Sequence, residues 1–132
     1  MMNDFVVYHK PEKMGYGALD VERLGIYTSK PISGVAGARI WLLTGEDTPR
    51  AYRLRATFII STVEPSDKAA FKTRISGKAG HFLDPMPVLN GEIWFTDFRR
   101  EQGNFAFGFQ SVRNPKHLAG LRSVLGASGV TL

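Results

Sequence analysis

Aromatic side chains are the residues of this sequence with the clearest capacity for chemistry, because they are more numerous than one pair of strands can bury. They are Tyr8, Tyr16, Trp41, Trp94, Phe95, Phe105, Phe107 and Phe109. A flat ring can stack on a nucleic-acid base, which contributes about 1–3 kcal/mol per base. We therefore predict a pocket lined by some of these rings. Phe58, Phe107 and Phe109 are expected in the core.

The two tryptophans are the strongest candidates for the edge of such a pocket. An indole N–H needs a hydrogen-bond partner, and at a rim a ligand or water can supply it. Trp41 and Trp94 each lie among residues with little polar capacity of their own. The alternative is that both are core residues.

Recognisable patterns of catalytic and metal-binding residues are missing. The sequence has no cysteine, and its three histidines, His9, His81 and His117, are far apart and lack a carboxylate at ligand spacing. No serine lies in a G-x-S-x-G context. The Gly77–Gly80 stretch could offer backbone N–H groups to one phosphate, with a plain turn as the alternative. We predict a protein that is not an enzyme and has no catalytic residue, no metal and no cofactor.

Acidic residues near Trp94 are the remaining candidates for acid–base chemistry. They are Glu92, Asp97 and Glu101. Carboxylates beside aromatic rings are usually solvated or paired, here with Arg99 and Arg100, so catalysis there is disfavoured.

The charge of the chain favours a polyanionic partner. The 132 residues carry a net charge of +5, and such a balance favours DNA or RNA, with solubility alone as the alternative. The cations that we expect to gather on one surface and contact a nucleic-acid backbone are Arg50, Arg53, Arg55, Lys72, Arg74 and Lys78. Arg53 and Arg55 are expected on the same strand face, because side chains alternate along a strand.

Length and composition predict one domain over residues 1–132 and a cytoplasmic location. No apolar run approaches the roughly 20 residues that span a bilayer, and the first residues lack a basic cluster typical of a signal peptide. The absence of cysteine fits a reducing compartment. No membrane partner is expected.

The pattern of apolar residues favours strands over helices. Strands are predicted at 5–8, 39–44, 51–63, 71–75 and, tightly curved, 105–109; 39–44 and 51–63 should form an antiparallel hairpin with one buried face on the second strand. Short helices are predicted at 19–26 and, as helix or turn, at 92–98, with a final helix from Pro115 to Leu125 after Asn114. Loops are predicted at 76–80 and 84–87. The fold class is α+β: a small, mixed, strongly bent β-barrel with short peripheral helices and a C-terminal helix.

Three blocks of sequence resemble the PUA-like superfamily of small β-barrels, nearest its EVE-type branch. They are Phe5-Val-Val-Tyr-His-Lys-Pro-Glu12, Gly37-Ala-Arg-Ile-Trp-Leu-Leu-Thr44 followed by the strand from Tyr52 to Val63, and Gly103-Asn-Phe-Ala-Phe-Gly-Phe-Gln110. The resemblance implies a nucleic-acid-binding barrel that holds a flipped, often modified, base in an aromatic pocket. By position on these blocks, it implies pocket walls at Tyr8, His9, Trp41 and Trp94, and residues that read the base edge at Asn104 and Gln110.

The leading hypothesis is thus a non-enzymatic module that binds DNA or RNA and takes up one base. A small-molecule or protein-interaction domain using the same cavity is the alternative. An enzyme acting on nucleotides or RNA is disfavoured by the missing catalytic sets.

Overall fold

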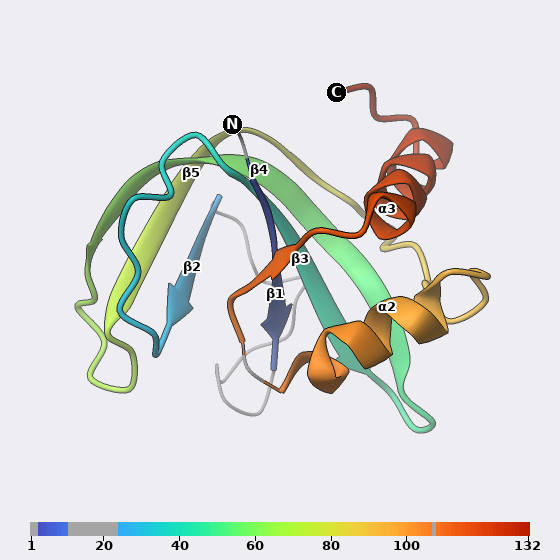
Figure 1. Cartoon of the computed structure of the whole chain (residues 1–132), viewed down its shortest axis with the longest axis horizontal. Helices are drawn as coiled ribbons and strands as arrows, with labels where there is room; N and C mark the ends of the chain where they lie inside the picture. Colours follow the sequence, from blue (N-terminus) through green and yellow to red (C-terminus); the bar gives the residue numbers. More distant parts are fainter. Residues whose placement is uncertain (1–2, 11–23, 107) are drawn as a thin grey trace.

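The computed structural model describes residues 3–10, 24–106 and 108–132 and shows a mixed α+β fold (Figure 1). Its elements are β1 (Asp4–His9), β2 (Gly25–Thr28), β3 (Arg39–Glu46), β4 (Ala51–Pro65), β5 (Thr73–Phe82), α2 (Phe95–Glu101), the 3-10 turn η2 (Gly103–Phe105), β6 (Gln110–Val112) and α3 (Pro115–Ala127). The predicted α+β class is confirmed.

The strands form one six-stranded sheet in the order β2-β5-β4-β3-β1-β6. The β1–β3 pair is parallel, whereas the other neighbours are antiparallel. The sheet is curved, and β4 and β5 arch across the molecule in Figure 1. Within the described ranges β2 and β6 remain its two edges, so the structure contains an open sheet and does not show the closure that the predicted barrel requires.

A β-bulge at Arg55 divides β4 into two halves. Leu42 pairs with Ala56 but Leu43 pairs with Leu54, so Arg55 is an extra residue. An extra residue reverses which face the following side chains occupy. Leu54 therefore packs on one side of the sheet and Ala56 on the other. The predicted alternation with a single buried face is wrong for this reason, although the strand itself is confirmed.

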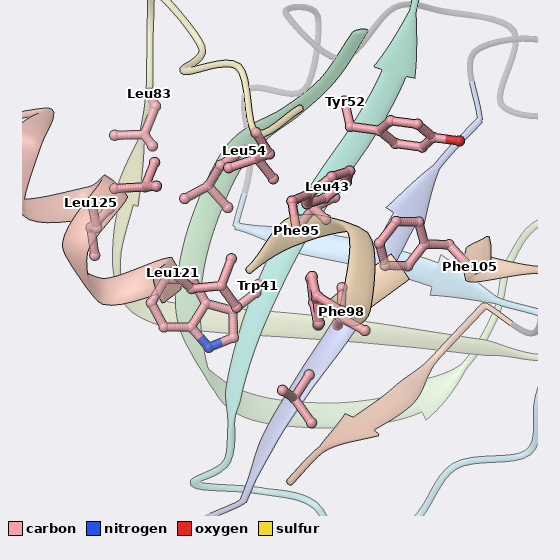
Figure 2. Close-up of a cluster of buried hydrophobic side chains, with 14 residues drawn as sticks. Trp41, Leu43, Tyr52, Leu54, Leu83, Phe95, Phe98, Phe105, Leu121 and Leu125 are labelled. Atoms are coloured by element: carbon pink, nitrogen blue, oxygen red, sulfur yellow. The ribbon is translucent and has the colours of Figure 1, made fainter. Parts of the chain in front are cut away.

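Two hydrophobic cores lie on the two sides of the sheet. The first, the helix-side core, joins β1, β3 and the start of β4 to α2 and α3, and includes Trp41, Leu43, Phe95, Phe98 and Leu121. Several of its members are labelled in Figure 2, where Trp41 lies beside Leu121. The second, the inner core, joins β1 and β3 to β2, β5 and the rest of β4, and includes Val7, Ile26, Ile40, Phe58 and Ile75. Burial on both sides fixes the register of the central strands.

The last helix begins where the Asn-Pro pair predicted. The side chain of Asn114 accepts a hydrogen bond from the backbone N–H of Lys116 at 3.0 Å, and Pro115 occupies the first helical position. This is a favourable N-terminal cap, because it satisfies one backbone donor that the helix leaves unpaired. The hairpin of β3 and β4 and the first strand are also confirmed.

Three local predictions are wrong. Residues 76–80 belong to β5 rather than a loop. Gly77 and Gly80 lie within this strand because the backbone there runs close to Phe58, and a Cβ at either position would collide with it. Residues 25–28 form β2, so the predicted helix at 19–26 does not reach its expected end, and its first part falls outside the described residues.

The described residues of the predicted strand at 105–109 form no strand, and β6 begins only at Gln110; Phe107 lies outside the described residues. Asn104, Phe105 and Gly108 have positive φ angles of 57°, 62° and 73°. Extended strands require negative φ, so the backbone turns here and pairs with β1 only from Gln110 onward. A non-glycine residue rarely adopts such a conformation, and packing must hold Phe105 in it.

Candidate functional site

An aromatic pocket lies at the edge of β1 that β6 leaves uncovered. β6 pairs only with Asp4, Phe5 and Val6, and among the described residues the following part of β1 has no strand on that side. The pocket has a volume of about 120 Å³ and is partly open. Its lining, hereafter the aromatic pocket, consists of Val7, Tyr8, Lys10, Tyr27, Thr28, Ser29, Phe71, Phe105, Ala106, Gly108 and Phe109.

Two pairs of aromatic rings contribute to the lining. Tyr8 stacks on Phe105, with ring centroids 5.6 Å apart and planes inclined by 12°. Tyr27 lies against Phe71 at 5.7 Å and 38°. The first pair joins β1 to η2, and the second joins β2 to the segment before β5. The pocket thus combines rings from both ends of the strand order, from β1 and η2 on one side and from β2 and the segment before β5 on the other.

Phe109 is the fifth ring of the lining and links the pocket to the body of the sheet. It stacks on Phe5 with ring centroids 4.6 Å apart. The ammonium group of Lys30, just after β2, donates a hydrogen bond to the backbone carbonyl of Phe109 at 2.8 Å. This charge-assisted hydrogen bond connects the residues after β2 with the residues before β6, and both segments contribute to the pocket lining.

Tyr8 is positioned by a glycine and an arginine. A Cβ at Gly45 would collide with the Tyr8 hydroxyl, so the phenol occupies space that any larger residue would fill. Nη1 of Arg50 donates a hydrogen bond to that hydroxyl at 3.3 Å. The Tyr8 phenol in turn raises the pKa of the Arg50 guanidinium above its ordinary value, mainly through its charge when ionised. Tyr8 and Arg50 therefore form one unit at the pocket.

Tyr27 has its own charged surroundings on the other side. Its hydroxyl donates to Asp67 at 3.0 Å, and the Lys68 ammonium lies 4.7 Å from its ring centroid. The Arg74 guanidinium is 5.8 Å from the same centroid and 3.1 Å from a carboxylate oxygen of Glu64. The hydrogen bond with Glu64 is the main reason that the pKa of Arg74 is raised. The cations here are thus partly balanced by two carboxylates.

Of the residues predicted to bind the base, Tyr8 lines the aromatic pocket. The prediction that Trp41 borders a pocket is wrong: its side chain is 0% exposed in the helix-side core. Its indole N–H donates to a carboxylate oxygen of Asp4 at 2.8 Å, so the donor needs no ligand. Trp94 is half-buried, lies over Gly120 of α3 and is not part of this lining.

The other three predicted residues are also outside the lining. His9 is buried at the end of β1, whereas Asn104 is exposed in η2. Gln110, in β6, pairs with Val6, and its buried side-chain oxygen has no hydrogen-bond partner within the described part of the chain. These residues neighbour pocket residues in sequence, but strand alternation and the positive φ angles at Asn104, Phe105 and Gly108 direct them elsewhere.

The predicted basic surface is divided. Arg50 and Arg53 lie at the start of β4, whereas Arg74 pairs with Glu64 near its end. Arg53 and Glu64 are 11 positions apart, which corresponds to roughly 36 Å along a strand. Lys72 and Lys78 are exposed near the start and in the middle region of β5.

Arg55 departs most from the predicted basic surface, because it is buried, with 6% of the residue exposed. It donates to the carbonyl of Leu83 at 2.9 Å and its guanidinium lies 4.9 Å from the ring centroid of Phe82. The bulge turns it away from the position that simple alternation predicts, so it does not share an exposed face with Arg53.

Sequence reasoning missed Lys10, Tyr27 and Phe71. Each lies at or near a strand end, where an aromatic or basic residue stands beside polar or basic neighbours, as in Tyr27-Thr-Ser-Lys30 and Phe71-Lys72. That signal is weak, because only the curvature of the sheet brings β2 close to β1.

Comparison of the chain with protein-family models, with curated proteins and with solved structures finds no match. The resemblance to the PUA-like superfamily therefore stays a prediction. Among the residues that the structure describes, no group of three or more potential ligands could hold a metal ion. In the same part of the chain, no helix has the length and apolar character needed to cross a membrane.

Proposed function

We propose that this domain binds DNA or RNA without catalysing a reaction, and that its aromatic pocket takes up one unpaired or flipped base, including a modified one. The observation that carries the proposal is the set of three partly exposed rings in one pocket lining, Tyr8, Tyr27 and Phe71, backed by the buried rings of Phe105 and Phe109 and joined by Lys10. Rings stack on bases whatever their sequence, and cations supply attraction to phosphate.

The size of the pocket supports a ligand group with one ring system. Its volume of about 120 Å³ is close to the roughly 150 Å³ of an engineered cavity that binds benzene. A base that leaves a duplex loses stacking and pairing at a cost of a few kcal/mol, and new stacking in the pocket would offset this cost. Single-stranded nucleic acid has less of this cost to meet, so it should bind more tightly than a duplex.

The proposal includes membership of the PUA-like superfamily, nearest the EVE-type branch, with a strongly bent barrel. The curved, mixed six-stranded sheet is compatible with such a barrel.

The test is a titration of labelled DNA and RNA oligonucleotides, single-stranded and duplex, at two ionic strengths. We expect tighter binding to the single strands and a steep loss of affinity as salt rises. Tyr27→Ala should weaken this binding, whereas Ile93→Ala, which alters a side chain 97% exposed and outside the pocket lining, should not. No binding to any oligonucleotide at low salt would refute the nucleic-acid function.

A small-molecule or protein-interaction domain using the same cavity is the second candidate. The limited volume of the pocket is the observation that favours a small ligand. Binding of free bases or nucleosides to the wild-type protein, together with no binding of oligonucleotides, would support it over the first proposal.

A further inference from the structure

Arg50 and Arg53 lie on the same hairpin but differ in their partners. Arg53 forms an ion pair with Asp47 at 3.3 Å, and its side chain is 30% exposed. Arg50 is exposed, and across residues 3–10, 24–106 and 108–132 no carboxylate lies within ion-pair distance of it. The charge of Arg53 is therefore locally balanced, whereas that of Arg50 is available to an anion.

The Arg50 guanidinium is held by a residue of the pocket lining, although Arg50 is not itself part of that lining. Its Nη1 donates to the hydroxyl of Tyr8, which itself lines the aromatic pocket. Gly45 leaves the space through which the Arg50 side chain passes, since a Cβ there would lie 2.8 Å from the Arg50 Cδ. A guanidinium has five N–H donors, so one bond to Tyr8 leaves others for a ligand. Its planar fork matches the oxygen atoms of a phosphate.

Lys10 is a second cation at the aromatic pocket. It follows β1 directly, two residues after Tyr8, and is part of the pocket lining. In the described part of the chain Lys10 has no ion pair with a carboxylate. A lysine acts as a mobile point charge, whereas an arginine fixes direction. The two cations thus complement each other beside the Tyr8–Phe105 rings.

We propose that Arg50, positioned by Tyr8 and assisted by Lys10, binds the phosphate group of the nucleotide whose base occupies the aromatic pocket. This inference rests on the proposed function and adds to it that the recognised unit is a nucleoside phosphate rather than a base alone. Arg50 is a binding residue for the phosphate, and Gly45 and Tyr8 determine where its guanidinium lies.

The experiment measures the affinities of the whole chain for the four ribonucleosides and for their 5′-monophosphates by nuclear magnetic resonance titration. We expect the monophosphates to bind about tenfold more tightly than the nucleosides, as for one charge-assisted contact. Arg50→Gln should remove this difference, with a larger loss of affinity for the monophosphates than for the nucleosides; both lose some affinity, because the Tyr8 wall loses one hydrogen bond in both cases. Arg53→Gln, which removes the same charge from the same hairpin, should retain the difference. Urea unfolding of both variants checks that the two substitutions leave the fold intact.

The outcomes separate the inference from the function on which it rests. Equal affinity for nucleoside and monophosphate, or a phosphate preference that survives Arg50→Gln, would overturn the inference while the base pocket stands. No binding of nucleosides, nucleotides or oligonucleotides would overturn both. Arg50-dependent binding of phenyl phosphate without binding of any nucleotide would also overturn both, and would indicate a phosphorylated aromatic side chain as the ligand.

Discussion

The aromatic rings of the helix-side core and those of the aromatic pocket differ in what surrounds them. Trp41, Phe98 and Phe105 are at most 1% exposed, and the first two lie between the sheet and the helices. Tyr8, Tyr27 and Phe71 are only partly buried and lie at strand ends or beside them. A ring that is enclosed on every side contributes to stability. A ring with one open face can accept a ligand.

Phe105 belongs to both regions, which shows how they are connected. It is buried among Tyr52, Phe95 and Phe98 in the helix-side core, and it also stacks on Tyr8 in the pocket. The positive φ of Phe105 sets the direction of this ring. The helix-side core thus holds the Phe105 ring in place, and Phe105 in turn supports the Tyr8 ring of the pocket.

The largest effect is expected from Trp41→Phe. The substitution leaves a cavity in the helix-side core and removes the indole donor to Asp4. We expect the free energy of unfolding to fall by about 2–3 kcal/mol, from lost packing and a lost bond to a carboxylate. Urea unfolding measures this, and affinity for nucleosides or oligonucleotides in the folded variant should not change.

Trp94→Phe is the matched control, because Trp94 is half-buried over Gly120. It should reduce stability by less, about 1 kcal/mol. If the Trp41 variant were as stable as the wild type but bound ligand weakly, the assignment of Trp41 to the core would be wrong.

The second effect is expected from Gly77→Ala in the inner core. The new methyl group would collide with the Phe58 ring, and β5 or the ring must move. Overpacking of this kind costs about 1–3 kcal/mol. Gly91→Ala meets open space and should change stability by no more than about 0.5 kcal/mol. Thermal unfolding of the two variants compares them, and equal midpoints would show that the inner core adapts to the added methyl group without cost.

The sequence predicts the strands well where a local rule applies. The period of two at 51–63 predicts β4, and Asn114-Pro115 predicts the start of α3, because strand alternation and helix capping depend on near neighbours. The bulge at Arg55 has no such local signal. It depends on how β4 pairs with β3, and it turned one expected surface cation into a buried residue.

For the candidate site, the sequence predicted the kinds of residues but not most of their positions. An excess of aromatic residues and positive charge indicated a ring-lined pocket, and Tyr8, one of the predicted binding residues, lies in the lining of the aromatic pocket. Tyr27 and Phe71 could not be placed, since their position beside Tyr8 follows from the curvature of the sheet. Trp41 was misplaced because Asp4, its hydrogen-bond partner, is 37 positions away in the sequence.

The third largest effect on stability is expected from Gly45→Ala, which changes the pocket through its contact with Tyr8. The added methyl group would displace the Tyr8 hydroxyl and the Arg50 Cδ. The Arg50 side chain is exposed and flexible, and the Tyr8 ring, although rigid, is only partly buried, so both can move and the free energy of unfolding should fall by about 1 kcal/mol. Affinity for oligonucleotides should fall more clearly, because the wall and its cation move together. Calorimetric titration checks this, with Gly126→Ala, a substitution into open space, as the control.

The smallest effect on stability, and the clearest on binding, is expected from Phe71→Ala. Phe71 is partly buried, lies against Tyr27 and lines the aromatic pocket. Removing its ring should change the free energy of unfolding by less than about 1 kcal/mol, because little of the core rests on it. If the ring stacks on a base, affinity should fall by about 5- to 150-fold, which corresponds to the 1–3 kcal/mol of one stacking contact.

Phe82→Ala is the matched control for this last prediction. Phe82 is also partly buried, but it packs against the inner core and the Arg55 guanidinium and is outside the pocket lining. Its loss should lower stability more than the loss of Phe71 and leave affinity unchanged. Oligonucleotide titration and urea unfolding of both variants decide the matter. If Phe71→Ala binds as tightly as the wild type while Phe82→Ala does not, the ligand contacts the face of β5 rather than the aromatic pocket, and the distinction between core rings and pocket rings fails.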